Sequence, residues 1–403
     1  MGVSGGGTRP NTLRPLPDLD PFRTLPPILY RLNRAKVRLV SKGSEKPFHP
    51  LRSNSSSHIH VPIPTETEQT AGIQLLKGVE ESVHRQVVGQ DETIKGLLIA
   101  LLTGGHVLLE GLPGLAKTLL VRSLAGALRI SFRRIQFTPD LLPGDVIGTP
   151  IYDQGTGEFR VYKGPVFANM LLADEINRAP PKVQSALLEA MEEEQVTIDG
   201  TTYPLPSPFL ALATQNPIEQ QGTYPLAEAQ LDRFMLKLRI DYPSRDEEGE
   251  IIERIALNPI RADGVSNDDP SLDDDLVSEK GGVATIPEVL EARAELNGVN
   301  VDQKIRDYVV DLVFATREPA DAGLPEFESL IEFGISPRAS IFLIRAARAY
   351  AYIEGRDFVL PDDVKSMAYP VLRHRLRTTY EADAQGIDPD DLIDRLLDTV
   401  PSP

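Results

Sequence analysis

The chain has 403 residues and a formal net charge of −17, and 41% of its residues are hydrophobic. This length is enough for two or three domains with a sizeable core. Cysteine is absent, which excludes disulfide bonds, thiolate catalysis and cysteine-ligated zinc and is consistent with a reducing cytoplasm.

The charge is unevenly distributed along the chain. Residues 1–62 hold 10 Lys or Arg against 3 Asp or Glu, so the remaining residues carry −24. An acidic body of this kind argues against a nucleic-acid-binding surface. The longest apolar run, 96–109, is broken at 103–105 and is too short to span a bilayer. The first residues also lack the apolar segment of a secretory signal, so we expect no membrane insertion.

Residues 1–66 are rich in Pro, Gly, Ser and Arg and show no sustained helix or strand period. We expect a disordered basic extension, with a short basic helix within 22–42 as an option. The extension could contact lipid or nucleic acid, or it could be solvated chain without a function. A wrongly assigned start codon would also produce it.

Between 67 and 243, apolar strand-like runs alternate with helical patterns, which is typical of a mainly parallel sheet between helices. Five strands are expected, at 106–110, 132–137, 169–173, 209–214 and 235–240. Helices are expected to begin near Ile73, Asp91, Lys117, Pro181 and Glu228. The helix from Pro181 is predicted by one apolar stripe, formed by Val183, Ala186, Leu187, Ala190 and Met191.

The first expected strand leads into Gly-Leu-Pro-Gly-Leu-Ala-Lys-Thr at 111–118. A buried strand, a glycine-rich turn and a helix form the arrangement that cradles a nucleotide triphosphate. In such a loop Lys117 would reach the β- and γ-phosphates, and the Thr118 hydroxyl would bind Mg²⁺. An ordinary Gly-Pro turn is the alternative. The general pattern has Gly before the lysine, where this chain has Ala116, and we expect a negative φ there because the turn continues into a helix.

Two hairpins are predicted among the strands of the sheet. One spans 147–161 with its turn at 153–157, and the other has the turn Asp199-Gly200 between apolar alternations. Both are additional to a minimal nucleotide-binding sheet. They are therefore candidates for contacts with a partner or substrate, with plain surface hairpins as the alternative.

An acidic pair follows the third expected strand. Asp174 and Glu175 come directly after an apolar run, where carboxylates would lie beside the phosphate loop. Asp174 could hold Mg²⁺ through water, and Glu175 could polarise an attacking water molecule. A chance acidic pair at a strand end is the alternative, and the preceding phosphate loop favours the functional interpretation.

Two further polar residues occupy positions that phosphoryl transfer would use. Asn216 closes the strand 209–214 and could hold the water or contact the γ-phosphate, although it could also be a turn residue before proline. Arg233 lies between a helix and the last strand and could serve a neighbouring subunit's nucleotide, as a finger arginine. Its alternative is an ion pair with Asp232 or Glu228.

After 243 the pattern becomes helical. Residues 244–285 are expected to hold a helix and an acidic flexible connection at 262–282, without the ligand spacing of a calcium loop. Residues 286–403 are expected to form a helical lid domain with helices at about 286–296, 301–317, 337–354, 361–376 and 388–398. His374 lies between two arginines, and we expect it on a solvated basic helix face.

These motifs resemble those of the MoxR family of AAA+ ATPases, in the branch with a hairpin inserted in the second helix, related to magnesium-chelatase subunits. The resemblance covers about 87–375. It is carried by Gly-Leu-Pro-Gly-Leu-Ala-Lys-Thr, Leu-Ala-Asp-Glu-Ile-Asn-Arg-Ala-Pro-Pro-Lys, Ala-Thr-Gln-Asn-Pro and Ala-Gln-Leu-Asp-Arg-Phe. It implies an α/β P-loop core with a parallel five-stranded sheet and inserted hairpins, followed by an all-α lid. An alanine before the lysine is usual in this family.

The resemblance also implies roles for individual residues. Glu175 would be the general base, Asn216 the first sensor and Arg233 the trans-acting finger. Within Gly-Ile-Ser-Pro-Arg at 334–338, Arg338 would contact the γ-phosphate from the lid. Thr118 and Asp174 would hold Mg²⁺. ATP would contact Val88, Gly89, Gln90, Gly111, Leu112, Pro113, Gly114, Leu115, Ala116, Lys117, Thr118 and Leu119.

The family further implies a homo-oligomeric ring, usually a hexamer, that hydrolyses ATP to remodel or mature protein complexes, often with a partner of the von Willebrand A type. Two other functions stay open. The chain could be a nucleotide-gated scaffold with little turnover, which the presence of both carboxylates and the finger arginine argues against. It could also be a nucleic-acid motor, although the hairpin at 195–206 carries no Lys or Arg.

Overall fold

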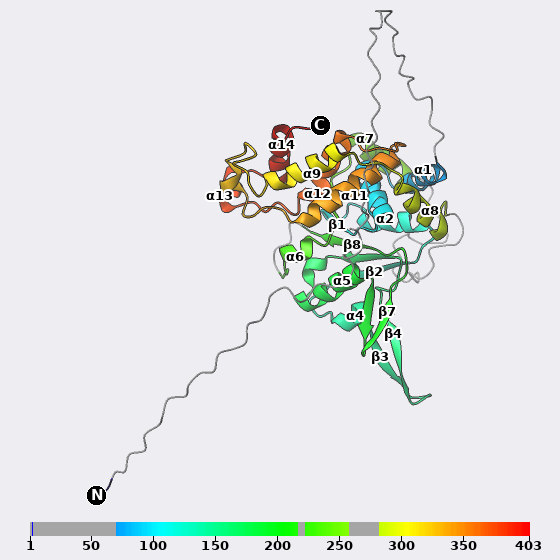
Figure 1. Ribbon diagram of the computed structural model, residues 1–403. Coiled ribbons are helices and arrows are strands. Elements are labelled where there is room, and N and C mark those ends of the chain that lie inside the picture. The colour runs from blue at the N-terminus through cyan, green and yellow to red at the C-terminus, as the bar shows by residue number, and fades with distance from the viewer. Residues whose placement is uncertain (1, 3–69, 217–221, 258–281) are drawn as a thin grey trace, which may run out of the picture. The chain divides into compact units, whose positions relative to one another are not determined.

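The computed structural model describes residues 2, 70–216, 222–257 and 282–403. Almost all of the basic extension expected over 1–66 and of the acidic connection expected over 262–282 lies outside these residues. The described chain contains a core with a central sheet, followed by a group of helices (Figure 1).

Five parallel strands form the central sheet in the order β2-β5-β8-β1-β9. Their bounds are β1 Val107–Gly111, β2 Phe132–Gln136, β5 Met170–Asp174, β8 Leu210–Gln215 and β9 Leu236–Ile240. The five strands predicted from the sequence are confirmed, with ends shifted by one residue. Because β5, β8 and β1 are neighbours, the segments that follow their carboxyl ends lie along one edge of the sheet.

Alternate residues of the strands are buried on opposite faces of the sheet, as the two-residue period of a strand requires. Val107 and Leu109 of β1 belong to one apolar cluster, whereas Leu108 belongs to the other. Both faces are covered, which explains why the strands read as continuous apolar runs instead of alternating ones.

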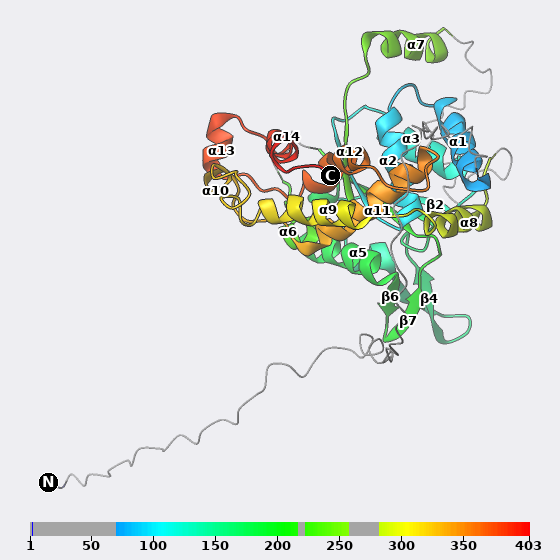
Figure 2. The same ribbon diagram turned by 45° about the horizontal axis from the view of Figure 1, so that its top comes forward.

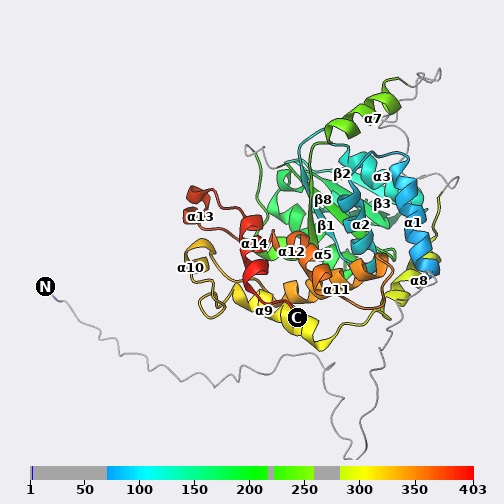
Figure 3. The same ribbon diagram turned by 90° about the horizontal axis from the view of Figure 1, so that it is seen from above.

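Helices cover the two faces unequally. On one face lie α1 Ala71–His84, α2 Asp91–Thr103 and α3 Lys117–Ala127, seen together in Figure 3. On the other lies α5 Pro181–Glu193, whose apolar stripe is buried except at half-buried Ala186. Shorter core helices are α4 Pro143–Ile147, η1 Ile176–Arg178 and α6 Glu228–Leu231. The expected starts at Asp91, Lys117, Pro181 and Glu228 are confirmed, and the first helix begins two residues before Ile73.

Both predicted hairpins are present. One pairs β3 Gly148–Asp153 with β4 Glu158–Lys163 and projects from the core (Figure 1). The other pairs β6 Gln195–Ile198 with β7 Thr201–Pro204. Gly148 begins the first hairpin with φ +105°, and a Cβ there would lie 2.3 Å from the carbonyl oxygen of Tyr162. Only glycine permits this close approach of the two strands.

Beyond β9, the described residues form helices and no further strand. The helices are α7 Arg245–Ile255, α8 Ile286–Leu296, α9 Gln303–Ala315, α10 Phe327–Leu330, α11 Pro337–Ile353, α12 Pro361–Leu372, α13 Tyr380–Gln385 and α14 Pro389–Thr399. The five predicted lid helices are confirmed, and α10 and α13 were not predicted because they are too short to show a helical period.

Helix α11 joins the lid helices to the core. It packs against α9 and α12 on one side and against α2 of the core on the other (Figure 2). Alanines 346, 347, 349 and 351 of α11 are fully buried, which lets neighbouring helices approach closely. Across the described ranges 70–216, 222–257 and 282–403, every helix is too short or too polar to cross a membrane.

Candidate functional site

The turn between β1 and α3 has the geometry of a phosphate cradle. Strand β1 ends at Gly111, α3 begins at Lys117, and the Lys117 ammonium donates a hydrogen bond to the Gly111 carbonyl at 2.6 Å. Gly114 has φ +86°. The backbone N–H groups of the first turn of α3 have no helical partner, so this turn can receive phosphate oxygens.

Ala116 differs from the sequence expectation. Its φ is +53°, in the left-handed region, so the prediction of a negative φ is wrong. Ala116 is the residue before α3, and its backbone is left-handed and not helical. Glycine is the residue favoured in this conformation.

Lys117 lies in the electrostatic field of both predicted carboxylates. Burial lowers the pKa of Lys117, while Asp174 and Glu175 both raise it through their negative charges. The three side chains follow the carboxyl ends of β1 and β5, two parallel strands that only β8 separates, so they gather at the same edge of the sheet.

Thr214 of β8 connects the two carboxylate residues. Its hydroxyl donates to Asp174 Oδ1 at 2.6 Å and accepts from the backbone N–H of Glu175 at 2.8 Å. The other Asp174 oxygen accepts from Arg134 at 2.6 Å. The hydroxyl therefore fixes the direction of the Asp174 carboxylate. The sequence places Thr214 only at the end of a strand, because its contacts with Asp174 and Glu175 depend on the pairing of β5 with β8.

The Glu175 backbone is left-handed, and its side chain contacts other residues than the Asp174 side chain does. Its φ is +56°, and its carboxylate accepts from Gln136 at 2.7 Å and pairs with Arg178 at 2.9 Å. A left-handed backbone at a non-glycine residue costs about 1–2 kcal/mol, and such strain is found often at functional positions. Asn216 directly follows β8 and is buried, beside the strand that ends in Asp174.

The donor groups at this edge fit a magnesium-bound triphosphate. Thr118 supplies a hydroxyl oxygen and Asp174 a carboxylate oxygen, the hard ligands that Mg²⁺ prefers, and Lys117 lies at a helix amino terminus that favours phosphate. The segment 88–90 precedes α2, and Gln90 donates to the Asp241 carbonyl at 3.3 Å. The placement of adenine there and the roles of Leu112, Pro113, Leu115 and Leu119 stay predictions.

The two arginines predicted to contact phosphate lie together. Arg233 pairs with Glu192 Oε2 at 2.7 Å, and Arg338 pairs with Glu192 Oε1 at 2.7 Å. Arg233 also donates to the Leu188 carbonyl at 2.9 Å. The alternative of an ion pair between Arg233 and Asp232 or Glu228 is wrong, because those carboxylates pair with other arginines.

These arginines line a cavity of about 280 Å³ whose other wall is the segment Gly104, Gly105 and His106. That segment precedes β1, whereas the phosphate loop follows β1. Five strand residues rise about 16 Å, so Arg233 and Arg338 lie at the opposite end of β1 from Lys117. Arg345 lines the same cavity. It follows Arg338 by seven residues, or two turns, on α11, and this spacing places both arginines on one face of the helix.

His374 does not lie on a solvated helix face, so that expectation is wrong. Its Nε2 is 3.0 Å from the Phe234 carbonyl, and burial together with the neighbouring Arg375 holds its pKa well below the ordinary value. His374 belongs to the contact between the turn that follows α12 and the finger segment, which we define as residues 232–235.

The sheet order, the strand-end carboxylates and the phosphate loop define a P-loop ATPase core with a helical lid. The family described as "ATPase family associated with various cellular activities (AAA)" matches residues 106–236, and the AAA lid domain matches 327–396. The chain is 48% identical to Chaperone MoxR1 of Mycobacterium tuberculosis, covering 87% of this chain and 88% of that protein.

It is also 36% identical to Protein MoxR of Paracoccus denitrificans, covering 81% of this chain and 96% of that protein. A crystal structure of a Cytophaga hutchinsonii protein superposes with a TM-score of 0.73 at 49% identity, covering 82% of this chain and 95% of that one. The chain therefore belongs to the MoxR family of AAA+ ATPases.

Proposed function

We propose that this protein hydrolyses ATP with Mg²⁺ in a homo-oligomeric ring and uses the energy to remodel or mature protein complexes. The observation that carries the proposal is the separation of the catalytic groups. Lys117, Asp174 and Glu175 gather at the carboxyl edge of the sheet, whereas Arg233 and Arg338 lie at the other end of β1. Each chain would thus contribute its loop and carboxylates to one pocket of the ring and its two arginines to the pocket of an adjoining subunit.

The first half binds the nucleotide and activates water. The α3 amino terminus and Lys117 bind the phosphates. Thr118 and Asp174 would hold Mg²⁺, which when bound would supply positive charge to the phosphate oxygens. Glu175 accepts the proton of the attacking water, and Asn216 orients that water. Gln136 and Arg178 hold the Glu175 carboxylate in position.

The second half completes the pocket of the adjoining subunit. Arg233 and Arg338 are about one third exposed and share one carboxylate. Ion pairs at such exposure contribute about 0–1 kcal/mol, so a triphosphate can replace Glu192 as their partner. Arg233 then stabilises the charge that develops on the transferred phosphoryl group.

The β3–β4 hairpin is our candidate for the surface that contacts the client protein. Ile151, Tyr152, Phe159 and Tyr162 are each at least half exposed, and Tyr152 packs edge-on against Phe159. Exposed aromatic residues on a projecting ribbon favour contacts with another protein. The relative named Chaperone MoxR1 supports a remodelling role. A partner of the von Willebrand A type is an expectation from the family alone.

The proposal is tested by measuring phosphate release from ATP by the full chain, with Mg²⁺ and with EDTA, alongside its mass in solution. We expect Mg²⁺-dependent turnover that rises with protein concentration as rings assemble. Lys117→Ala and Arg233→Ala are each expected to be inactive, and mixtures of the two are expected to regain activity at boundaries that combine an intact loop with an intact finger arginine.

Turnover by a monomer, or absence of rescue at every mixing ratio, would exclude the shared pocket. Nucleotide binding without any turnover would instead favour a nucleotide-gated scaffold.

A further inference from the structure

The finger segment, residues 232–235, has little support of its own. The preceding helix α6 has only four residues, Glu228–Leu231, and is too short to be stable in isolation. Arg233 itself contacts the core, through Glu192 and the Leu188 carbonyl. The contacts that hold Asp232 and Phe234 in place therefore determine the position of the Arg233 backbone, from which its side chain extends.

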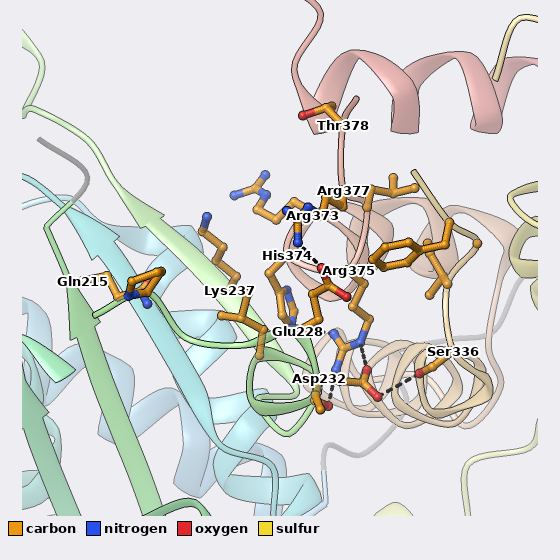
Figure 4. A pocket seen from close by; sticks show the side chains of 17 residues that line it. Gln215, Glu228, Asp232, Lys237, Ser336, Arg373, His374, Arg375, Arg377 and Thr378 are labelled. Atoms are coloured by element: carbon orange, nitrogen blue, oxygen red, sulfur yellow. Dashed lines mark hydrogen bonds and ion pairs between the residues drawn. The ribbon is translucent and has the colours of Figure 1, made fainter. Parts of the chain in front are cut away.

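Arg375, in the turn that follows α12 in the lid, binds the finger segment on both sides of Arg233. Figure 4 shows its contact with Asp232. Its guanidinium donates to Asp232 Oδ1 at 2.8 Å and to the Asp232 carbonyl at 3.0 Å. It also donates to the Phe234 carbonyl at 2.6 Å and to the Met235 carbonyl at 3.3 Å. One side chain thus binds the residues before and after the finger arginine.

A second lid residue completes this contact. Ser336, which precedes α11, donates its hydroxyl to Asp232 Oδ2 at 2.9 Å, as Figure 4 shows. Both carboxylate oxygens of Asp232 therefore bind lid groups. Ser336 lies two residues before Arg338, so the same turn of the lid positions Arg338 near Glu192.

The chemistry of Arg375 suits a residue that orients the finger segment better than one that only holds the lid against the core. Its side chain is 3% exposed, and burial lowers its pKa to about 10 despite the nearby Asp232. Taking a charge out of water costs several kcal/mol, and apolar side chains often hold two surfaces together as well or better. What a guanidinium adds is a planar fork of donors in fixed directions, which here meet three backbone carbonyls of the finger segment.

We propose that Arg375 is a positioning residue for Arg233, and that it transmits the position of the lid to the finger segment. A lid that moves with the nucleotide state of its own subunit would then move the arginine offered to the next subunit. This inference rests on the proposed function, because it requires that Arg233 acts on a neighbouring pocket.

The central test is Arg375→Met, which keeps a long apolar stem and removes the donors. Asp232 keeps the Ser336 hydroxyl and access to water, so folding is expected to survive. We expect turnover to fall about 10- to 100-fold, the loss that follows from misplacing a group by about 1 Å. Mixing with Lys117→Ala is expected to restore turnover, because the Arg375→Met subunit has an intact phosphate loop and receives an intact finger.

A matched control removes a lid arginine that is remote from the finger segment and pairs with a buried carboxylate; its own side chain is 24% exposed. Arg356 pairs with Asp363 at 2.7 Å within the lid, and the Asp363 side chain is 3% exposed. Arg356→Met is expected to lower the melting temperature at least as much as Arg375→Met while leaving turnover within about twofold. Hydrogen exchange supplies a readout independent of ATP. Amides of 228–235 are expected to exchange faster in Arg375→Met and not in Arg356→Met.

Wild-type turnover in Arg375→Met would overturn the inference. So would a loss that Lys117→Ala does not rescue, because Arg375 would then act on its own pocket. Should Arg375→Met not fold, Ser336→Ala removes one hydrogen bond to Asp232, and a smaller loss that Lys117→Ala rescues is expected, with unchanged turnover counting against the inference. If Arg233→Ala itself is not rescued by Lys117→Ala, the proposed function has failed, and faster exchange of 228–235 still reports whether Arg375 holds the segment.

Discussion

Arg233 and Arg338 bind the two oxygens of one carboxylate, that of Glu192, each at 2.7 Å. The first arginine precedes the last strand of the core and the second lies in the first turn of α11 in the lid, so their meeting depends on how the lid packs on the core. Both face the cavity at the amino-terminal end of β1. This placement separates them from Lys117 of the same chain.

We therefore expect Arg338 to act on the same neighbouring pocket as Arg233. Arg338→Ala should assemble and bind ATP but hydrolyse it about 10²-fold or more slowly, because one cation that stabilises phosphate charge is missing. Phosphate release from mixtures with Lys117→Ala should exceed the sum of the two separate variants. Rates that merely add would place Arg338 on its own nucleotide.

Replacing the proposed general base should separate binding from hydrolysis. Glu175→Gln keeps the shape of the side chain and its contact with Gln136 but cannot accept a proton, so we expect a loss of about 10²–10⁴ in turnover. The affinity for a fluorescent ATP analogue should stay within a few-fold of wild type, whereas Lys117→Ala should lose binding. Full hydrolysis by Glu175→Gln would remove the assignment. The same variant, held with ATP, is the suitable bait for client proteins.

The left-handed backbone at Ala116 predicts a stabilising substitution. Ala116→Gly removes the clash of a Cβ at φ +53° and restores the residue usual in phosphate loops. We expect the free energy of unfolding to rise by about 0.5–1 kcal/mol, since the relief of strain exceeds the entropy cost of glycine. Urea denaturation of both proteins without nucleotide measures the difference in the free energy of unfolding. A lower stability of Ala116→Gly than of the wild type would mean that the alanine is not strained.

His106 predicts a loss of stability in mild acid. Its Nδ1 accepts from the Ala211 N–H at 3.1 Å, and its Nε2 is 2.9 Å from the Met191 carbonyl, an arrangement that suits the neutral ring. Burial lowers its pKa to about 4. Between pH 6.5 and 4 the unfolded chain binds a proton that the folded chain excludes, so the free energy of unfolding falls as pH falls, by on the order of 3 kcal/mol.

His106→Gln provides the comparison, because it keeps an acceptor and a donor without titrating in this range. Other acid-sensitive groups are common to both proteins, so the difference between their stability curves isolates His106. We expect the wild-type free energy of unfolding to fall more steeply below pH 6.5, as measured by denaturant titrations at pH 7.5, 6, 5 and 4.5. Parallel curves would contradict the assignment.

Much of the core could be predicted because its signals are local. The strand that ends at Gly111 and the helix that starts at Lys117 are specified by apolar runs and turn residues that are adjacent in the chain. The position of Asp174 and Glu175 beside the loop that precedes Lys117 could be predicted because parallel strands bring their carboxyl ends to one edge of a sheet. By contrast, α10 has four residues and α13 has six, and such short helices carry no periodic pattern.

The chain itself, through local apolar periodicity and the spacing of Gly, Lys and carboxylates, determined the P-loop core and the gathering of Lys117, Asp174 and Glu175 at one edge of its sheet. Only the packing of the lid decided which cations share Glu192, which carboxylate Arg375 binds, and at which end of β1 the two arginines lie. The contacts of Arg338 with Glu192 and of Arg375 with Asp232 join residues more than 100 positions apart. Their geometry follows from how helix surfaces fit together, which no stretch of neighbouring residues encodes.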